Sequence, residues 1–345
     1  MPETSFEKKI NEIYNRALKN GGLLYFENTV INKVENDIEF QIRLAPSLAK
    51  KPTDNIGKKE IIVNPNNANE PKVDPFAPYD QQLFVEEYEK YIILLNKYCI
   101  IPKHLLVVTK EYESQANPLN PNDFDALWHC MKQIKSQKSL AFYNCGELSG
   151  ASQSHKHMQI LTLSDEPPMS SPICTIQDKK PGEIFELAEL PFIHYLSFID
   201  PQKLCDNESS DDKSSDDKSS DDKSSDDKSS DGEPGQYLNK LFHSMLSILI
   251  ESLHNQLLSS EGGEEEEEEK KGKSSFRTLS YNFIMTQKWM MIVPRCNSTH
   301  ELQIDINSLG FAGMLLAKSE DELECIKGVG VMKFLKEVAI PKKNL

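Results

Sequence analysis

Apolar residues recur with helical spacing at the start of the chain. Thr4 is placed to cap a helix, and Glu7, three residues later, completes the pattern of a capping box. Gly21 is placed to end this helix, because glycine readily adopts the backbone conformation that follows a helix C-terminus. The apolar stripe predicts that one helix face packs on a core, and it comprises Phe6, Ile10, Ile13, Tyr14, Ala17 and Leu18.

Strand patterns follow. Residues 38–45, IEFQIRLA, alternate between apolar and polar as a half-buried strand does, and residues 64–79 are rich in Asn and Pro, which indicates an irregular loop. Residues 91–112 hold two β-rich apolar runs separated by Pro102, which predicts two strands joined by a short turn. A helix from Asn122 or Asp123 to about Ser136, a strand at 140–144 and a further strand come next. Short links between strands favour an antiparallel sheet with packed helices, an α+β fold.

Two acidic tracts interrupt the second half of the chain. The repeat SSDDK runs from Ser209 and contains no apolar residue, so it cannot offset the entropy lost on ordering and is expected to be a disordered linker. A second tract at 261–273 is expected to be a solvated insertion. Between the tracts, residues 236–258 form an amphipathic helical pattern; the segment SYNFIMTQKWMMIVPR then predicts two strands, and Ser319 with Glu322 starts a helix. We therefore expect a core region at 1–206, a linker at 207–235 and a C-terminal region at 236–345.

The charge of the chain resides largely in these tracts. The net charge is -15, and the tracts carry nine of those charges, from nine Asp against four Lys at 209–231 and seven Glu against three Lys at 261–273. No basic stripe is dense enough to indicate nucleic-acid binding, and no apolar run is long enough to predict a membrane span. The seven widely spaced cysteines form no C-x-x-C pair, which indicates reduced thiols. We expect a cytoplasmic or nuclear monomer without nucleic-acid or membrane partners.

The chemistry of the chain is concentrated in GASQSHKHMQIL, residues 150–161. Alternate side chains of a strand share one face, so His155, His157 and Gln159 point one way and Lys156 points the other. The glycines and serines before them suit a turn whose backbone N–H groups hold an anion. The pattern indicates a phosphate cradle that leads into two imidazoles.

Three interpretations of this strand are open on spacing alone. An H-x-H pair can supply two metal ligands, but a catalytic zinc needs a third, and no other histidine has a matching spacing. The histidines can also be ordinary half-buried strand residues. In the third interpretation, a neutral imidazole attacks an activated phosphate while its other nitrogen donates to an acceptor that sets the tautomer. Gln159 then stabilises negative charge without supplying a titrating proton.

The pattern N-x-G-x3-G-x-S-x2-H-x-H-x-Q resembles the transferase branch of the histidine-triad superfamily. Its hydrolases carry a third histidine at the position of Gln159, and its uridylyltransferases usually have proline at the position of Lys156. PKHLLVVT at 102–109 also resembles the superfamily strand before the catalytic segment. The segments PSLAKKP, LLNKY, HKHMQIL, SYNFIMTQKW and LGFAGMLLAK are similar to the fungal diadenosine tetraphosphate phosphorylase, or ATP adenylyltransferase, family. This resemblance implies a histidine-triad/uridylyltransferase-like antiparallel sheet with packed helices.

The resemblance also implies a reaction and a set of site residues. His157 would attack the α-phosphorus of diadenosine tetraphosphate, ATP would leave, and phosphate would release the AMP as ADP. Exchange of phosphate with adenylyl sulfate would use the same chemistry. A divalent cation, Mg²⁺ or Mn²⁺, would arrive with the nucleotide. The residues implied to contact nucleotide or phosphate are Lys51, Asn96, Lys97, Asn144, Gly150, Ala151, Ser152, Gln153, Gln159, Ser280, Tyr281, Asn282 and Gln287.

Other functions stay open at this point. A uridylyltransferase or a hydrolase of the same superfamily would use related residues, and a nucleotide sensor would bind without turnover. The intact pair of His157 and Gln159 speaks against a sensor, because a protein that only binds has no need of a nucleophile. Lys156 lies on the opposite strand face from His157, so we expect it to be a solvated surface group.

Overall fold

The computed structural model describes residues 2–50, 74–204, 233–258 and 279–342. Its helices are α1 (Ser5–Lys19), α2 (Pro121–Gln133), α3 (Ser170–Cys174), α4 (Pro234–Leu258), α5 (Ser308–Phe311), α6 (Glu320–Val329) and α7 (Val331–Val338), with short 3-10 turns at Pro46–Lys50, Gln81–Leu83, Glu147–Ser149 and Pro201–Leu204. Its strands are β1 (Leu24–Tyr25), β2 (Thr29–Glu35), β3 (Ile38–Leu44), β4 (Phe84–Tyr88), β5 (Tyr91–Leu95), β6 (Tyr98–Cys99), β7 (Leu105–Thr109), β8 (Lys138–Cys145), β9 (His157–Leu163), β10 (Ile184–Phe185), β11 (Tyr195–Phe198), β12 (Tyr281–Met285), β13 (Trp289–Pro294) and β14 (Met314–Ala317).

A nine-stranded sheet organises the described residues. Its order is β10-β11-β13-β12-β8-β9-β7-β5-β4, and every neighbouring pair is antiparallel. Strands β12 and β13 come from the C-terminal region, yet they lie between β8 and β11 of the N-terminal region. The two regions expected from the sequence therefore share one sheet, and the expected linker at 207–235 lies almost wholly outside the described residues.

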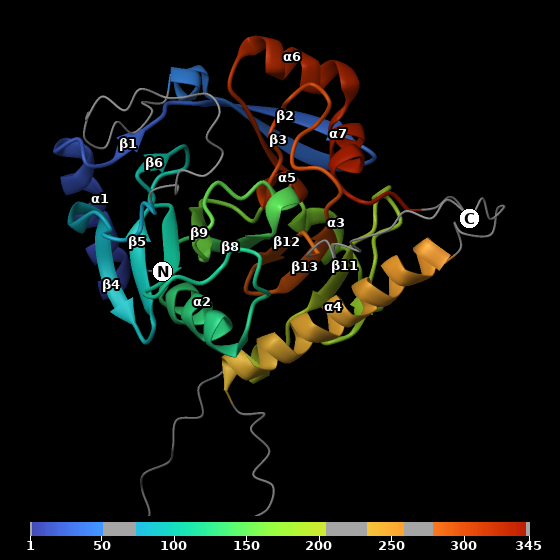
Figure 1. Cartoon of the computed structure of the whole chain (residues 1–345), viewed down its shortest axis with the longest axis horizontal. Coiled ribbons are helices and arrows are strands. Elements are labelled where there is room, and N and C mark those ends of the chain that lie inside the picture. The colour runs from blue at the N-terminus through green and yellow to red at the C-terminus, as the bar shows by residue number, and fades with distance from the viewer. Residues whose placement is uncertain (1, 51–73, 205–232, 259–278, 343–345) are drawn as a thin grey trace, which may run out of the picture.

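Two apolar cores cover the two faces of this sheet. The first lies between the sheet and helices α1, α2 and α4, and it includes Met158 and Ile160 of β9. The second lies on the other face, under the three-stranded sheet β14-β3-β2 and helices α5 to α7, and it includes Phe142 and Leu161. Figure 1 shows α2 and α4 on one side of the sheet and α6, α7, β2 and β3 on the other. The α+β fold class expected from the sequence is confirmed.

Several local predictions hold in detail. Thr4 and Glu7 form the capping box of α1, β3 alternates between buried and more exposed residues along its length, and Ser319 caps α6 by accepting from the Glu322 N–H. The predicted start of α2 is wrong by two to three residues. Asn120 is the N-cap, because its side chain accepts from two backbone N–H groups and Pro121 suits the first helical position.

Candidate active site

A hydrogen bond at the start of β9 fixes the ring of His157. Its Nδ1 donates to the backbone oxygen of His155 at 2.8 Å, since a carbonyl oxygen can only accept. The proton of the neutral ring is therefore on Nδ1, and Nε2 keeps its lone pair. Among the described residues no hydrogen bond to Nε2 is found. This is the tautomer that a nucleophilic imidazole requires.

Gln115 fills the place where β8 and β9 part. The ladder between these strands ends at Phe142 and Gln159. Beyond that point, the Gln115 Oε1 accepts from the His157 N–H at 2.8 Å, and its Nε2 donates to the Asn144 and His157 carbonyls at 2.8 and 3.3 Å. A buried side-chain amide thus replaces the missing strand neighbour and holds the backbone of His157 in place.

His155 accepts from the His157 ring through its carbonyl, and both of its own ring nitrogens also form hydrogen bonds. Its Nδ1 donates to the Asp74 carboxylate at 2.7 Å, and its Nε2 lies 3.0 Å from the Thr109 hydroxyl, which donates to it. Both ring nitrogens are occupied, so the H-x-H pair does not offer two free metal ligands. No group of three or more His, Cys, Asp or Glu residues suited to a metal ion occurs within the described ranges.

His157 lies under an aromatic cover. The ring of Phe76 is 5.5 Å from that of His157 and 5.7 Å from that of His155. The side chain of His157 is only 3% exposed. Burial lowers the pKa of His157 below its ordinary value, and the neighbouring His155 lowers it further, while the hydrogen bond to the His155 carbonyl raises it. The imidazole is therefore neutral at physiological pH.

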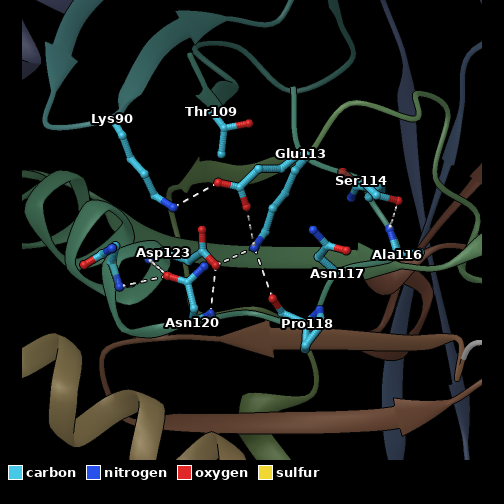
Figure 2. Close-up of polar contacts among 12 residues, drawn as sticks. Lys90, Thr109, Glu113, Ser114, Ala116, Asn117, Pro118, Asn120 and Asp123 are labelled. Atoms are coloured by element: carbon cyan, nitrogen blue, oxygen red, sulfur yellow. Dashed lines mark hydrogen bonds and ion pairs between the residues drawn. The ribbon is translucent and has the colours of Figure 1, made fainter. Parts of the chain in front are cut away.

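Lys156 corrects one expectation from the sequence. It does lie on the opposite strand face, but it is completely buried and not solvated. Its Nζ lies 2.6 Å from the Asp123 carboxylate, 3.6 Å from that of Glu113 and 3.1 Å from the Pro118 carbonyl. Figure 2 shows this network, in which Glu113 also reaches Lys90. This network connects residues 110–120, which include Gln115, to the face of β9 opposite His157.

A cavity of about 510 Å³ adjoins the histidine strand. Five of the predicted contact residues line it, namely Asn96, Gly150, Ala151, Ser152 and Gln159. Gly150 has a φ of +78°, and a Cβ there would lie 2.5 Å from the Ile306 carbonyl. Only glycine fits this turn, which places the backbone at the cavity wall. The volume lies within the usual range of nucleotide-sized pockets.

Other predicted residues are not brought to this cavity. Asn144 and Asn282 are buried behind it: the Asn144 Oδ1 accepts from the Asn282 amide and from Ser308, and the Asn282 amide also reaches the Ser149 carbonyl. The Ser280 hydroxyl accepts from the Leu148 N–H. These side chains support the turn before the histidine strand.

The remaining predicted contacts lie further away or beside the site. Tyr281 packs into the core on the other sheet face, and Gln287 lies at the far end of β12, where its amide donates to the Met131 carbonyl at 3.0 Å. Gln153 is exposed. Lys97 lies next to the cavity residue Asn96 and over the ring of Tyr98. Lys51 lies outside the described residues.

Sequence reasoning missed most of the cavity wall, including two residues that carry polar chemistry. His104, in PKHLLVVT, lines the cavity beside Gln159, and Arg43 of β3 also lines it. The Arg43 Nη1 donates to the neutral Asn28 amide oxygen at 3.0 Å, its buried Nε has no partner, and it has no ion pair within the described part of the chain. Lys318 also lines the cavity, but its charge is matched by Asp305 at 2.6 Å. Arg43 thus supplies a positive charge without an ion pair in the described ranges to a wall that also carries the carboxylates of Glu147 and Glu322.

Comparison with known families identifies this arrangement. The Ap4A phosphorylase N-terminal domain family matches residues 1–178, and the ATP adenylyltransferase C-terminal domain family matches residues 188–341. The chain belongs to the Ap4A phosphorylase family. It is therefore a nucleotidyltransferase, and the resemblance found in its sequence is confirmed. Ap4A denotes diadenosine tetraphosphate.

Relatives of this family match along nearly the whole chain. Diadenosine 5',5'''-P1,P4-tetraphosphate phosphorylase 2 of Saccharomyces cerevisiae is 28% identical over 341 residues, which cover 94% of this chain and 90% of that protein. Protein APA1 of the same yeast is 26% identical over 325 residues, 90% of this chain and 86% of that protein. The crystal structure of yeast Ap4A phosphorylase Apa2 superposes with a TM-score of 0.70 at 24% identity, covering 99% of this chain and 97% of that chain. The same yeast protein in complex with Ap4A superposes with a TM-score of 0.68. These superpositions show that the chains share a fold.

No helix in the described ranges is both long and apolar enough to span a bilayer.

Proposed function

We propose that this protein catalyses the reversible phosphorolysis of diadenosine tetraphosphate to ADP and ATP. The observation that carries the proposal is the His157 ring, whose Nδ1–H donates to the His155 carbonyl and leaves the lone pair on Nε2, two residues before Gln159, which lines the cavity. Membership of the Ap4A phosphorylase family and the yeast relative named diadenosine tetraphosphate phosphorylase 2 support the choice of substrate.

The reaction proceeds in two displacements at one phosphorus. The His157 Nε2 attacks the α-phosphorus of the substrate, the bond from that phosphorus to the bridging oxygen breaks, and ATP leaves with the bridging oxygen. An oxygen of inorganic phosphate then attacks the AMP–His157 adduct, the P–N bond breaks, and ADP leaves. His157 is regenerated, so atoms and charge balance over the cycle.

The cavity supplies groups for a polyanionic ligand. The backbone at residues 150–152 can donate to phosphate oxygens, and Arg43 is a cation without an ion pair in the described ranges. The carboxylates on the wall are Glu147, Asp305 and Glu322, of which Asp305 is already paired with Lys318.

We infer that a Mg²⁺ or Mn²⁺ ion arrives bound to the nucleotide phosphates, where it neutralises charge. We also propose that the enzyme is a monomer.

The same two steps extend to adenylyl sulfate. Attack of His157 on its phosphorus releases sulfate, and phosphate then forms ADP from the same adduct. This activity requires no additional residue, because only the leaving group differs.

The proposal is tested by incubation with diadenosine tetraphosphate and Mg²⁺, with and without phosphate, followed by separation of the nucleotides. Phosphate-dependent formation of ADP and ATP is expected. AMP and ATP in amounts independent of phosphate would indicate a hydrolase, exchange of UDP-sugars a uridylyltransferase, and binding alone a sensor. The His157→Ala variant is expected to bind AMP, to melt as the wild type does and to lose turnover, because the lost group acts in the covalent step.

A further inference from the structure

His104 lies on the same sheet face as the catalytic pair. In the ladder between β7 and β9, Val108 is opposite His157 and Leu106 is opposite Gln159. Alternate residues share a face, so His104, two residues before Leu106, lies on that face one step beyond Gln159. The backbone supports this extension, because the Asn96 N–H donates to the His104 carbonyl at 2.7 Å. Both His104 and Gln159 line the cavity.

Neighbouring groups determine which ring nitrogen of His104 carries the proton. The Tyr98 N–H donates to the Asn96 Oδ1 at 3.2 Å, which fixes the orientation of that amide. Its NH₂ group therefore faces the ring, and the Asn96 Nδ2 donates to the His104 Nδ1 at 3.1 Å. A ring nitrogen that accepts cannot carry a proton in the neutral imidazole, so the proton of His104 is on Nε2.

This N–H is buried without an acceptor. The side chain of His104 is 9% exposed, and its Nε2 has no hydrogen-bond partner among the described residues. Burial lowers the pKa of His104 to about 4, the contact with the Gln159 side chain raises it, and His157 lowers it. The ring is thus neutral near pH 7, and a buried N–H without an acceptor is costly, so an acceptor is expected in the working enzyme.

We propose that His104 is a positioning residue for Gln159, donating from Nε2–H to the Gln159 Oε1 when nucleotide is bound. Asn96, His104 and Gln159 then form one directional chain of donors that begins at the Tyr98 backbone. An amide has one accepting and one donating end, so holding Oε1 toward His104 turns the NH₂ toward the phosphate. The reversed amide would present its oxygen to a phosphoryl oxygen and repel it.

The inference deepens the proposed function, on which it rests. It gives this glutamine a fixed polarity, which a free amide in a cavity would lack. A neutral imidazole with a strongly lowered pKa suits the task, because it donates without adding a charge or releasing a proton.

Two conservative variants of His104 separate this role from simple packing. Glutamine places its amide nitrogen near the position of Nε2, whereas asparagine reaches only the position of Nδ1. His104→Gln is expected to keep kcat within about threefold of the wild type, and His104→Asn to lower kcat by about 10- to 100-fold, the range for losing one oriented donor. The two variants should have similar melting temperatures, because both replace the ring by a neutral amide.

A double-mutant cycle tests whether His104 acts through Gln159. His104→Asn in a Gln159→Ala background should lower kcat by no more than about twofold beyond Gln159→Ala alone, because the group that it orients is gone. The proposal would be overturned if the fold-loss in kcat of the double variant equals the product of the two single fold-losses, or if His104→Asn has the kcat of the wild type.

Nuclear magnetic resonance of the imidazole nitrogens tests the inference separately from turnover. In the intact wild-type protein near pH 7, His104, assigned by the resonance missing in His104→Gln, is expected to be the neutral Nε2–H tautomer. Addition of AMP should shift this N–H. If the wild type does not turn over diadenosine tetraphosphate, the proposed function fails, whereas an Nδ1–H tautomer or an imidazolium would reject the inference whatever the activity.

Discussion

At the scale of single residues, burial decides the chemistry of the histidine pair. His157 is enclosed by β9, Gln115 and Phe76, and its neutral form is favoured because a buried imidazolium loses hydration. Its Nδ1–H donates to the His155 carbonyl, which leaves the lone pair of the neutral ring on Nε2. Neither effect requires a metal ion or a base, because the ring already has the protonation state of a nucleophile.

The acid limb of the pH profile should report on this burial. A lowered pKa means that His157 stays neutral until the pH falls below its ordinary value of 6.5. The loss of kcat/KM on acidification is therefore expected to have its midpoint below pH 6.5, with little change between that midpoint and neutral pH. Circular dichroism at each pH serves as the control for unfolding. A midpoint above 6.5 would mean that His157 is not the group observed or that its surroundings favour the charged form.

Gln159 should control which acceptor takes the AMP group. An amide donates without a titrating proton, whereas histidine at this position can help to activate water. Gln159→His is expected to raise the ratio of AMP to ADP formed, even if turnover falls. Gln159→Ala should mainly lower the rate, by about 10- to 1000-fold. The AMP-to-ADP ratio measured at several phosphate concentrations tests this prediction. If Gln159→His gives the wild-type ratio at every concentration, Gln159 does not determine whether phosphate or water accepts the AMP group.

At the scale of elements, buried polar contacts hold the start of β9 on both of its faces, that of His157 and that of Lys156. Lys156, fully buried, joins β9 to the start of α2 through Asp123 and to residues 110–120 through Glu113. Asp123 also accepts from the Tyr91 hydroxyl of β5 at 2.7 Å. The buried Lys156–Asp123 pair therefore links β9, α2, β5 and residues 110–120, the segment that carries Gln115.

Loss of the buried cation should be costly. Lys156→Met leaves the Asp123 carboxylate buried without its counter-ion, and removal of one partner of a buried pair costs about 3–5 kcal/mol. Lys90→Met is the matched control, because Lys90 belongs to the same network but its side chain is 42% exposed; its effect should be below about 1 kcal/mol. Urea denaturation measures both free energies of unfolding. Equal losses in the two variants would show that the Lys156 pair contributes little.

At the scale of the whole molecule, the sheet joins distant parts of the chain. Strands β12 and β13 lie between β8 and β11, and Asn282 of β12 is in register with Asn144 of β8. The cavity likewise combines β3 near the N-terminus with residues 305–318 near the C-terminus. The active site therefore requires both regions.

Removal of the acidic repeat should leave the enzyme working. Residues 209–228 contain only Ser, Asp and Lys, which supply no apolar surface for burial. A shorter connection changes loop-closure entropy only slightly. Deletion of 209–228 is expected to leave the melting temperature and kcat close to those of the full chain. A folded deletion variant with much lower kcat would reveal a catalytic role for the repeat.

Features that depend on near neighbours along the chain could be predicted from the amino-acid sequence alone. The capping box of α1, the alternation along β3 and the common face of His157 and Gln159 follow from helix and strand periods, which are local. The sequence also contains the motif that identifies the family.

The distant residues that surround that motif are set by strand order and helix packing. Gln115 holds the backbone of His157 from 42 positions away. His104 and Gln159 line the same cavity, and Arg43 reaches it from β3. The opposite face of β9 is polar at Lys156, so the alternation predicted a solvated lysine, but α2 and residues 110–120 bury it. Strand order and helix packing set such contacts, and a period of two residues specifies the face of a side chain without specifying what covers that face.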